Sequence, residues 1–173
     1  TYHDTPGAAS AGVPFINPAN AYTNTFNPQE MYVRVVNTDG CVTIGTFDLL
    51  VNPLPVFNVP TLLEVCDDAL ADGLTGIDLS LKDTEITGGV PNLVVTYFLT
   101  PEDADAGTPE LVLPYTNISN PQTVYPRINN LTTGCFDTTE LELFVNPLPI
   151  PIAPAALESC DNNADDVALF DLT

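Results

Sequence analysis

Hydrophobic and polar residues alternate with a period of two in several short segments, the pattern of strands with one buried face. Phe47, Leu49 and Val51, for example, share one face and alternate with Thr46, Asp48 and Leu50. Other segments are rich in β-branched and aromatic residues, which also favours strands. The predicted strands are residues 31–35, 46–51, 93–99, 124–128 and 140–145. Turn sequences at 37–40 and 130–134 predict hairpins, and Pro126 predicts a local edge or bulge in its strand.

Helices are predicted to be few and short. The chain contains 17 Pro and 10 Gly, which leave little room for a long helix. Residues 101–107 begin with Pro and acidic residues and end with Gly, so they predict a single helical turn. Residues 80–87 predict another short helix. The expected fold class is therefore all-β.

The chain also contains an internal repeat. Short motifs recur in the same order about 94 residues apart: 51–55 with 145–149, 40–41 with 134–135, and 66–67 with 160–161. A unit of about 94 residues has the size of an immunoglobulin-like sandwich, so we predict tandem immunoglobulin-like β-sandwich repeats.

The repeat divides the chain into three parts. Residues 1–55 are predicted to be the C-terminal part of one repeat, 56–149 a complete repeat, and 150–173 the N-terminal part of the next. The Asn-Pro-Leu-Pro segments between them are stiff, because each Pro fixes its own φ and restricts the preceding residue. The units are therefore expected to stand end to end as a semi-rigid rod.

The charge balance excludes several classes of function. The chain has 23 Asp and Glu against 3 Lys and Arg, a net charge of −20. Such a surface repels nucleic acids and anionic membranes and attracts divalent cations such as calcium. No apolar stretch approaches the roughly 20 residues that span a bilayer, so no membrane insertion is expected. Each of the scarce arginines, Arg34 and Arg127, is expected to pair with a nearby carboxylate.

Catalysis is not expected. The only histidine is His3, and no Ser or Cys has a plausible partner base for nucleophilic chemistry. Cys66 and Cys160 lack the paired cysteine or histidine spacing of zinc sites. We therefore predict that the chain is not an enzyme.

Two acidic loops are the strongest chemical signal. They follow Cys66 and Cys160, and clustered carboxylates with a Gly or Asn turn suit calcium, which takes six to eight oxygen ligands. The candidate ligands are Asp67, Asp68 and Asp72 in the first loop, and Asp161, Asn162 and Asp165 in the second. The same sequences also suit an acidic turn in which Asx side chains cap the backbone. Both interpretations are open at this stage.

Several of these motifs together resemble a known family. They are Cys66-Asp67-Asp68 with Asp78-Leu79-Ser80, Cys160-Asp161-Asn162 with Phe170-Asp171-Leu172-Thr173, Tyr32-Val33-Arg34-Val35, Thr133-Gly134-Cys135, and the Val-Asn-Pro-Leu-Pro segments. The chain resembles the tandem immunoglobulin-like repeats of very large, type IX-secreted surface adhesins of gliding Flavobacterium-type bacteria. The resemblance implies a secreted protein of the cell surface with an adhesive or filament-forming role.

The resemblance also implies partners and a modification. The partners would be neighbouring repeats, copies of the same chain, and surface glycans or other cells. Asp137-Thr138-Thr139 fits the O-glycosylation pattern of this bacterial group, which makes Thr138 a candidate site. An array of carbohydrate-binding modules is the alternative function. It needs an exposed aromatic platform, and the chain has no Trp.

The four cysteines suggest disulfides in an oxidising compartment, with free core thiols as the alternative. Cys41 begins a strand of about ten residues, roughly 33 Å long, that leads away from the linker. A Cys41–Cys66 bridge would fold the rod back on itself, because bridged Cα atoms lie within about 7 Å. We therefore predict a bridge from Cys66 to Cys135, with the partners of Cys41 and Cys160 outside this chain.

Two explanations account for these unmatched cysteines. The chain can be a window on a longer protein. Alternatively, residues 150–173 of one copy complete residues 1–55 of the next, joining Cys160 to Cys41 in an open filament. A unit completed in this way would lack the counterpart of residues 81–95, which counts against it.

Overall fold

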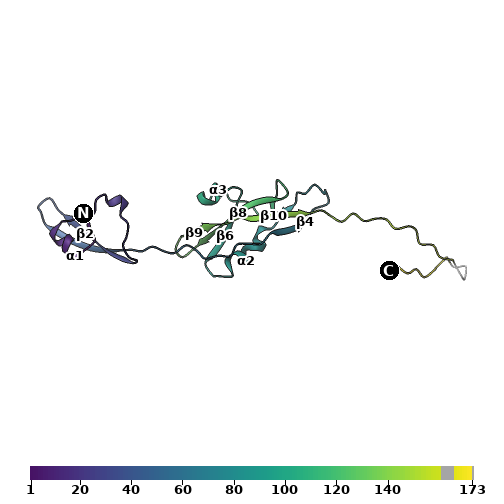
Figure 1. Ribbon diagram of the computed structural model, residues 1–173, viewed down its shortest axis with the longest axis horizontal. Helices are drawn as coiled ribbons and strands as arrows, with labels where there is room; N and C mark the ends of the chain where they lie inside the picture. The colour runs from purple at the N-terminus through teal and green to yellow at the C-terminus, as the bar shows by residue number, and fades with distance from the viewer. Residues whose placement is uncertain (161–165, 173) are drawn as a thin grey trace.

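The structure is a computed structural model that describes residues 1–160 and 166–172, and Figure 1 shows an elongated molecule. A small sheet at the N-terminal end is joined by an extended linker to a larger β-sheet body in the centre. Residues 147–160 and 166–172, on the far side of that body, contain no strand or helix. The described chain is mostly strands with few helices, which confirms the all-β sandwich fold.

The N-terminal body is a three-stranded antiparallel sheet of order β1-β2-β3. Its elements are β1 (Tyr2–His3), α1 (Pro6–Ala11), η1 (Ala19–Ala21), β2 (Gln29–Val36) and β3 (Val42–Leu49). The β2–β3 hairpin runs in register from Gln29 opposite Leu49 to Val36 opposite Val42. The turn at residues 37–40 thus forms the predicted hairpin.

The central body is built from a main sheet and a smaller layer packed on it. Its elements are β4 (Leu63–Cys66), β5 (Gly76–Ile77), η2 (Leu79–Lys82), α2 (Asp83–Thr87), β6 (Leu93–Phe98), α3 (Pro101–Ala106), β7 (Tyr115–Thr116), β8 (Gln122–Asn130), β9 (Phe136–Thr138) and β10 (Leu141–Asn146). The main sheet has the order β4-β10-β8-β6, with β9 also paired to β8, and β5 pairs with β7 separately. The short helices predicted at 80–87 and 101–107 are present as η2 with α2 and as α3.

The hydrophobic core lies between these two layers. Ile77, Leu79 and Ile86 from the smaller layer are fully buried. They form one cluster with buried residues of the main sheet: Leu63, Val95, Tyr97, Val124, Ile128, Leu141, Leu143 and Val145. The alternating pattern in 140–145 is therefore the pattern of a strand with one face in this core.

Pro126 lies at an interruption in the hydrogen-bonded ladder of β8. On one side of β8, the pairing with β10 ends at Val124 and the pairing with β9 begins at Arg127. Proline has no N–H to donate, so a position between two partner strands suits it. The carbonyl oxygen of Pro126 accepts a bond from Thr139 N at 3.0 Å, which joins the two segments.

The sequence repeat is also a structural repeat. Asn120 exchanges two hydrogen bonds with the backbone of Val145, at 2.8 and 2.9 Å, and Asn27 exchanges the same two bonds with Val51. The side chain of Gln122 donates to the hydroxyl group of Tyr115, as Gln29 does to Tyr22. Residues 1–51 are thus folded like the C-terminal part of the complete unit.

Candidate functional site

The acidic loop after β4 brings its three aspartates together. One carboxylate oxygen from each of Asp67, Asp68 and Asp72 lies within 4.8 Å of the others, and Asp67 is buried. Asp67 accepts bonds from Asp68 N at 2.9 Å and Gly73 N at 2.8 Å. Asp68 and Asp72 each cap the backbone N–H two residues later. The loop therefore has the Asx turns of one interpretation and the clustered oxygens of the other.

A second side chain holds this loop in place. Asn117, next to β7, accepts a bond from Thr75 N at 2.7 Å and donates to Gly73 O at 2.9 Å. The loop is thereby held against the β5–β7 sheet with its carboxylates grouped. The candidate ligands of the second loop, Asp161, Asn162 and Asp165, lie outside the described residues.

His3 is buried, and both of its ring nitrogens have partners. Nδ1 lies 2.7 Å from Pro14 O, and Nε2 lies 2.8 Å from Thr1 Oγ1. Because a carbonyl oxygen only accepts, Nδ1 donates to Pro14 O, while Nε2 pairs with the threonine hydroxyl group. His3 thus ties β1 to the segment that follows α1.

The structure does not bring Cys66 and Cys135 together. Cys66 lies opposite Asn146, beyond the Gln122 end of β8. Cys135 lies in the turn at the other end of β8, where its carbonyl oxygen accepts a bond from Asn130 N at 2.9 Å. Eight residues of strand, roughly 26 Å, separate these ends of β8, far more than a bridge can span. All four sulfurs are free thiols.

Cys135 instead lies against the linker that precedes its unit. Its sulfur is 3.8 Å from Asn52 O. Asn52 occupies the repeat position of Asn146, whose partner across the β10–β4 ladder is Cys66. The position beside Asn52 is therefore the position that a preceding unit gives to its own counterpart of Cys66. Cys135 therefore lies at the edge where, by the repeat, a preceding unit would carry its counterpart of Cys66.

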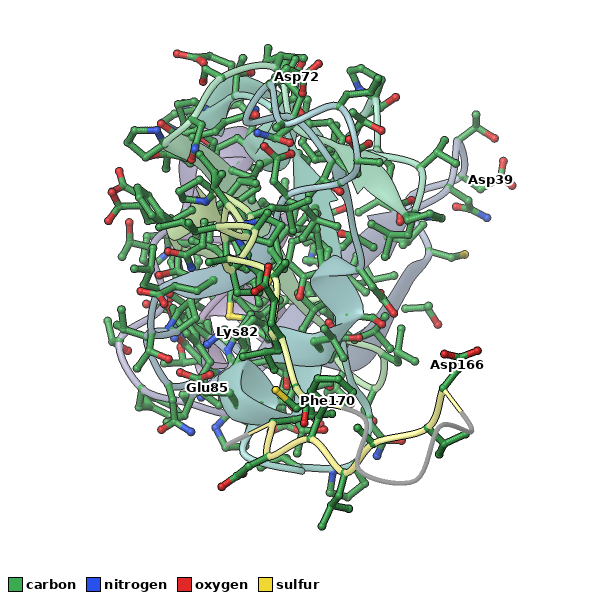
Figure 2. The ribbon with its side chains drawn as sticks, turned by 90° about the vertical axis from the view of Figure 1, so that its right-hand side faces the viewer. Asp39, Asp72, Lys82, Glu85, Asp166 and Phe170 are labelled. Atoms are coloured by element: carbon green, nitrogen blue, oxygen red, sulfur yellow. The ribbon has the colours of Figure 1, made fainter. Side chains whose placement is uncertain are left out.

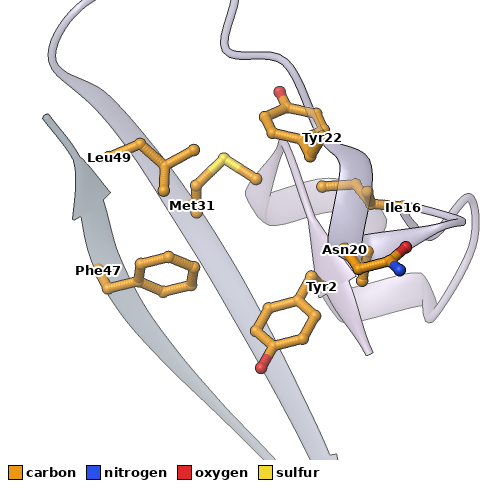
Figure 3. Close-up of a pocket in the computed structure, with 8 residues that line it drawn as sticks. Tyr2, Ile16, Asn20, Tyr22, Met31, Phe47 and Leu49 are labelled. Carbon is orange, nitrogen blue, oxygen red and sulfur yellow. The ribbon is translucent and has the colours of Figure 1, made fainter. Parts of the chain in front are cut away.

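The N-terminal body has an open apolar face. A cavity of about 360 Å³ opens there, and Figure 3 shows the side chains around it. The lining residues are Tyr2, Ile16, Ala19, Asn20, Tyr22, Met31, Phe47 and Leu49. The rings of Tyr2 and Phe47 meet edge to face, with centroids 6.0 Å apart. In the central body, the counterparts Tyr97 and Leu141 pack in the core around Ile77 and Leu79. The cavity is thus the place that β4, β5 and η2 fill in the complete unit.

Lys82, Glu85 and Thr61 tie the linker to α2. Lys82 Nζ donates to Thr61 Oγ1 and to Glu85 Oε2, each at 2.7 Å. Glu85 also accepts from Thr61 N, and Asn58 N donates to Ile86 O at 2.8 Å. These bonds to Glu85, with that from Lys82 the strongest, lower its pKa to about 2. Figure 2 looks along the molecule from its C-terminal end and shows Lys82 beside Glu85.

Among the residues that the structure describes, Arg34 and Arg127 do not make the carboxylate pairs expected from the sequence. Arg127 donates through Nη1 to Ala104 O and Asp105 O, at 2.7 and 2.8 Å, at the C-terminal end of α3. Its guanidinium group also lies 3.3 Å from the ring centroid of Phe136. A cation there satisfies carbonyl groups left unpaired at a helix end. Gly107, with φ +74, ends α3 in the left-handed conformation next to this guanidinium, and Gly12, with φ +78, ends α1 in the same way next to Arg34. Arg34 with Gly12 and Arg127 with Gly107 occupy equivalent positions in the repeat. This recurrence was the signal in the sequence that the arginines contact a helix end.

Thr138 lies in β9 and is half-buried. Its backbone N–H donates to Asp137 Oδ1 at 2.9 Å. Its glycosylation stays a prediction. In the part of the chain that the structure describes, no helix is long and apolar enough to cross a membrane.

Comparison with known proteins identifies one family. The family model described as the Flavobacterium inter-domain disulphide bond domain matches residues 1–55 and 62–149. No curated protein and no solved structure matches the chain. The family description supports a Flavobacterium-type protein in which the domain has an inter-domain structural role. With most of its residues covered by that model, the chain belongs to the Flavobacterium inter-domain disulphide bond domain family.

Proposed function

We propose that the chain is a structural rod segment of a secreted surface adhesin or extracellular filament, in which successive immunoglobulin-like units are cross-linked by disulfides. The observation that carries this proposal is the 3.8 Å contact between Cys135 Sγ and Asn52 O across the junction. It favours a bridge between Cys135 of one unit and the counterpart of Cys66 in the unit before it. This pairing replaces the bridge within one unit that the sequence suggested.

Such a bridge would stiffen the junction. Asn-Pro-Leu-Pro already restricts the linker, and the Lys82–Glu85–Thr61 bonds hold its end against α2. A covalent link at Cys135 adds a second connection between the same two bodies, so bending at the linker would require both to move. When the bridge forms, two thiols lose two protons and two electrons, and a disulfide oxidant is reduced to two thiols. A stiff spacer suits a protein that displays an adhesive end away from a cell.

A tandem of two copies of residues 56–149 tests the bridge. In one version, Cys135→Ser in the first copy and Cys66→Ser in the second leave the two cysteines that meet at the junction. We expect this version to lose both free thiols on oxidation, as measured by alkylation and mass spectrometry. The matched control carries Cys66→Ser in the first copy and Cys135→Ser in the second. It leaves two cysteines at the far ends, which should stay free.

The opposite result would contradict the proposal. If a single copy of residues 56–149 forms an internal Cys66–Cys135 bridge while the junction version stays reduced, the units are not cross-linked. Circular dichroism of each version shows whether the comparison is made between folded proteins. A glycan array with the 173-residue chain addresses adhesion directly. Saturable binding would favour the carbohydrate-binding alternative over a spacer.

We also propose that the Asp67–Asp68–Asp72 loop binds calcium. The specific observation in favour is the grouping of the three carboxylates within 4.8 Å. The chain's charge of −20 makes relief of repulsion by a divalent cation favourable. Because calcium takes six to eight oxygens, water would supply the remaining ligands. A calcium-dependent melting temperature, described below, tests this proposal.

A further inference from the structure

The linker between the two bodies is held at its N-terminal end by a side chain. Asn27 donates to Val51 O at 2.8 Å and accepts from Val51 N at 2.9 Å. Val51 lies two residues beyond the end of β3 at Leu49, so these bonds tie the outgoing chain to the N-terminal body. Asn120 makes the same pair of bonds to Val145, and each unit therefore holds its outgoing chain in the same way.

The central body holds the other end of the linker through packing and through α2. Phe57 packs against the hydrophobic core of this body, and Pro55 is buried. Asn58 N donates to Ile86 O at 2.8 Å, and Asn58 Nδ2 donates to Glu85 O at 3.0 Å. Both carbonyl groups belong to the last turn of α2, where the helix itself supplies no donor. The incoming chain thus closes the C-terminal end of α2.

Three residues, 52–54, lie between these two attachments, and Figure 1 shows the linker extended between the bodies. At roughly 3.1 Å per residue in a polyproline conformation, they span about 9 Å. Pro53 fixes its own φ, and Asn52 and Leu54 each precede a proline, which disfavours the helical region for both. Residues 46–72 contain no glycine, the residue best suited to a hinge. The span is therefore shorter than the several residues over which a proline-rich segment stays straight.

We propose that Asn27 and Phe57 are positioning residues that make the junction rigid before any disulfide forms. With both ends of the linker docked, a rotation of one body against the other must break the Asn27 bonds, unpack Phe57 or strain the restricted dihedrals of residues 52–54. The 3.8 Å contact between Cys135 Sγ and Asn52 O is then a fixed feature of the junction. The linker thereby holds the Cys135 thiol toward the unit that precedes it.

For the disulfide, this inference rests on the proposed function. Two thiols on separate bodies react at a rate set by their effective concentration, which is largest when the connection holds them near the bonded geometry. A docked linker raises that concentration for the pair at the junction and lowers it for other pairs of cysteines. The bridge, whose formation transfers two protons and two electrons to a disulfide oxidant, then locks an arrangement that the linker has already set.

Residual dipolar couplings of the reduced 173-residue chain test the rigidity without the bridge. We expect one alignment tensor to fit the couplings of both bodies. Phe57→Ala should remove this common fit, because the N-terminal body then moves independently and its couplings shrink. Phe57→Leu keeps an apolar side chain against the core and should restore the common fit. Val59→Ala is the matched control, since Val59 lies in the same linker and is 74% exposed, and it should behave like the unaltered chain.

Asn27→Ala tests the attachment to the N-terminal body. It removes both bonds to Val51 and should likewise reduce the couplings of that body. Asn20→Ala, which changes another exposed asparagine of the same body, should keep the common tensor. Amide spectra of each variant show whether both bodies are folded, and the Phe57 variants decide the inference if Asn27→Ala unfolds its body.

Two results with the reduced chain would overturn the inference. Separate tensors in the unaltered chain would show that the junction stays flexible until a bridge forms. A common tensor in Phe57→Ala would show that this side chain stabilises its own body without positioning the junction.

The tandem of residues 56–149 separates these results from a failure of the proposed function. In the version that keeps the two junction cysteines, Phe57→Ala in the second copy should slow bridge formation by about tenfold, because the effective concentration falls. An unchanged rate would overturn the positioning role. A tandem that stays reduced, together with a common tensor in the 173-residue chain, would contradict the bridge and support the rigid junction.

Discussion

The hydroxyl group of Tyr97 donates a 2.7 Å hydrogen bond to Asp83 Oδ1 and so joins the main sheet to α2. Burial raises the pKa of both groups, and the carboxylate raises the pKa of the tyrosine further. The bond from Tyr97 acts in the opposite direction on Asp83 and lowers its pKa. Tyr2, the repeat counterpart of Tyr97, lies exposed on the open face instead. The same strand position is thus anchored in one unit and exposed in the other.

Removing the Tyr97 hydroxyl group should destabilise the central body. Hydrogen bonds to charged groups contribute about 1.5–3 kcal/mol, and Tyr97→Phe leaves Asp83 without this donor. We expect the free energy of unfolding of residues 62–149 to fall by that order in urea titrations. Tyr2→Phe is the control and should change stability by less than about 0.5 kcal/mol. Equal effects of the two variants would contradict the role of this bond.

The free energy of unfolding should decrease as the pH is lowered through the range in which Glu85 titrates. Its pKa is about 2 in the folded chain, below its ordinary value of 4.5. The carboxylate therefore stabilises the fold above about pH 4.5, and this contribution is lost as pH falls from 4.5 to 2. Glu85→Gln should flatten the stability profile within that window. Asp83, whose pKa is raised, acts in the opposite direction and offsets part of the loss.

Chemical denaturation at a series of pH values measures this dependence. Glu110→Gln, at an exposed position, is the control and should keep the profile of the unaltered chain. A Glu85→Gln profile as steep as the control would show that the Lys82 and Thr61 bonds do not set the acid dependence.

Calcium should raise the melting temperature of the central body. A ligand that binds only the folded state stabilises it by mass action, with an effect that grows with the logarithm of its concentration. Asp68→Ala should abolish the rise, because it removes one of the three grouped carboxylates. Asp39→Ala, an exposed acid outside the loop, should leave it intact. Identical melting curves with calcium and with chelator would leave the capping turns as the only role of the loop.

The two repeat-equivalent asparagines provide a comparison within one chain. Asn120 and Asn27 make the same pair of bonds to Val145 and Val51, but the first pair is partly buried and the second is exposed. Leaving buried backbone groups unpaired costs about 1–3 kcal/mol. We therefore expect Asn120→Ala to destabilise its body more than Asn27→Ala does. Hydrogen exchange at the amides of Val145 and Val51 measures the local effect of each variant.

Strands and repeats were predictable from the sequence because they depend on local patterns. The alternation at Leu141, Leu143 and Val145 identified a strand with a buried face, and the motif spacing identified the unit. Neither pattern says which strands become neighbours. The parallel pairing of β4 with β10 joins segments about 80 residues apart. No turn sequence predicts this pairing, because parallel strands are not connected by a tight turn.

The cysteine arrangement was missed for the same reason. The position of Cys66 depends on the β4–β10 pairing, and that of Cys135 on the turn at the other end of β8. The predicted Cys66–Cys135 bridge required both cysteines to lie at the same end of the unit. The structure places them at opposite ends of β8. The contacts of Arg127 likewise depend on α3 lying beside β8, although the Arg and Gly repeat gave a sequence signal.

The parallel β4–β10 pair also determines how the unit responds to tension. The preceding linker enters at the start of β4 and the following linker leaves at the end of β10, and the two strands run side by side in the same direction. A pulling force through both linkers therefore slides these strands past each other, and it loads their hydrogen bonds together in shear. Bonds loaded in this way break collectively, whereas a hairpin pulled from its open end breaks them one after another. The geometry of this one strand pair thus makes each unit resist extension. The force that a unit withstands is governed by its rate of unfolding.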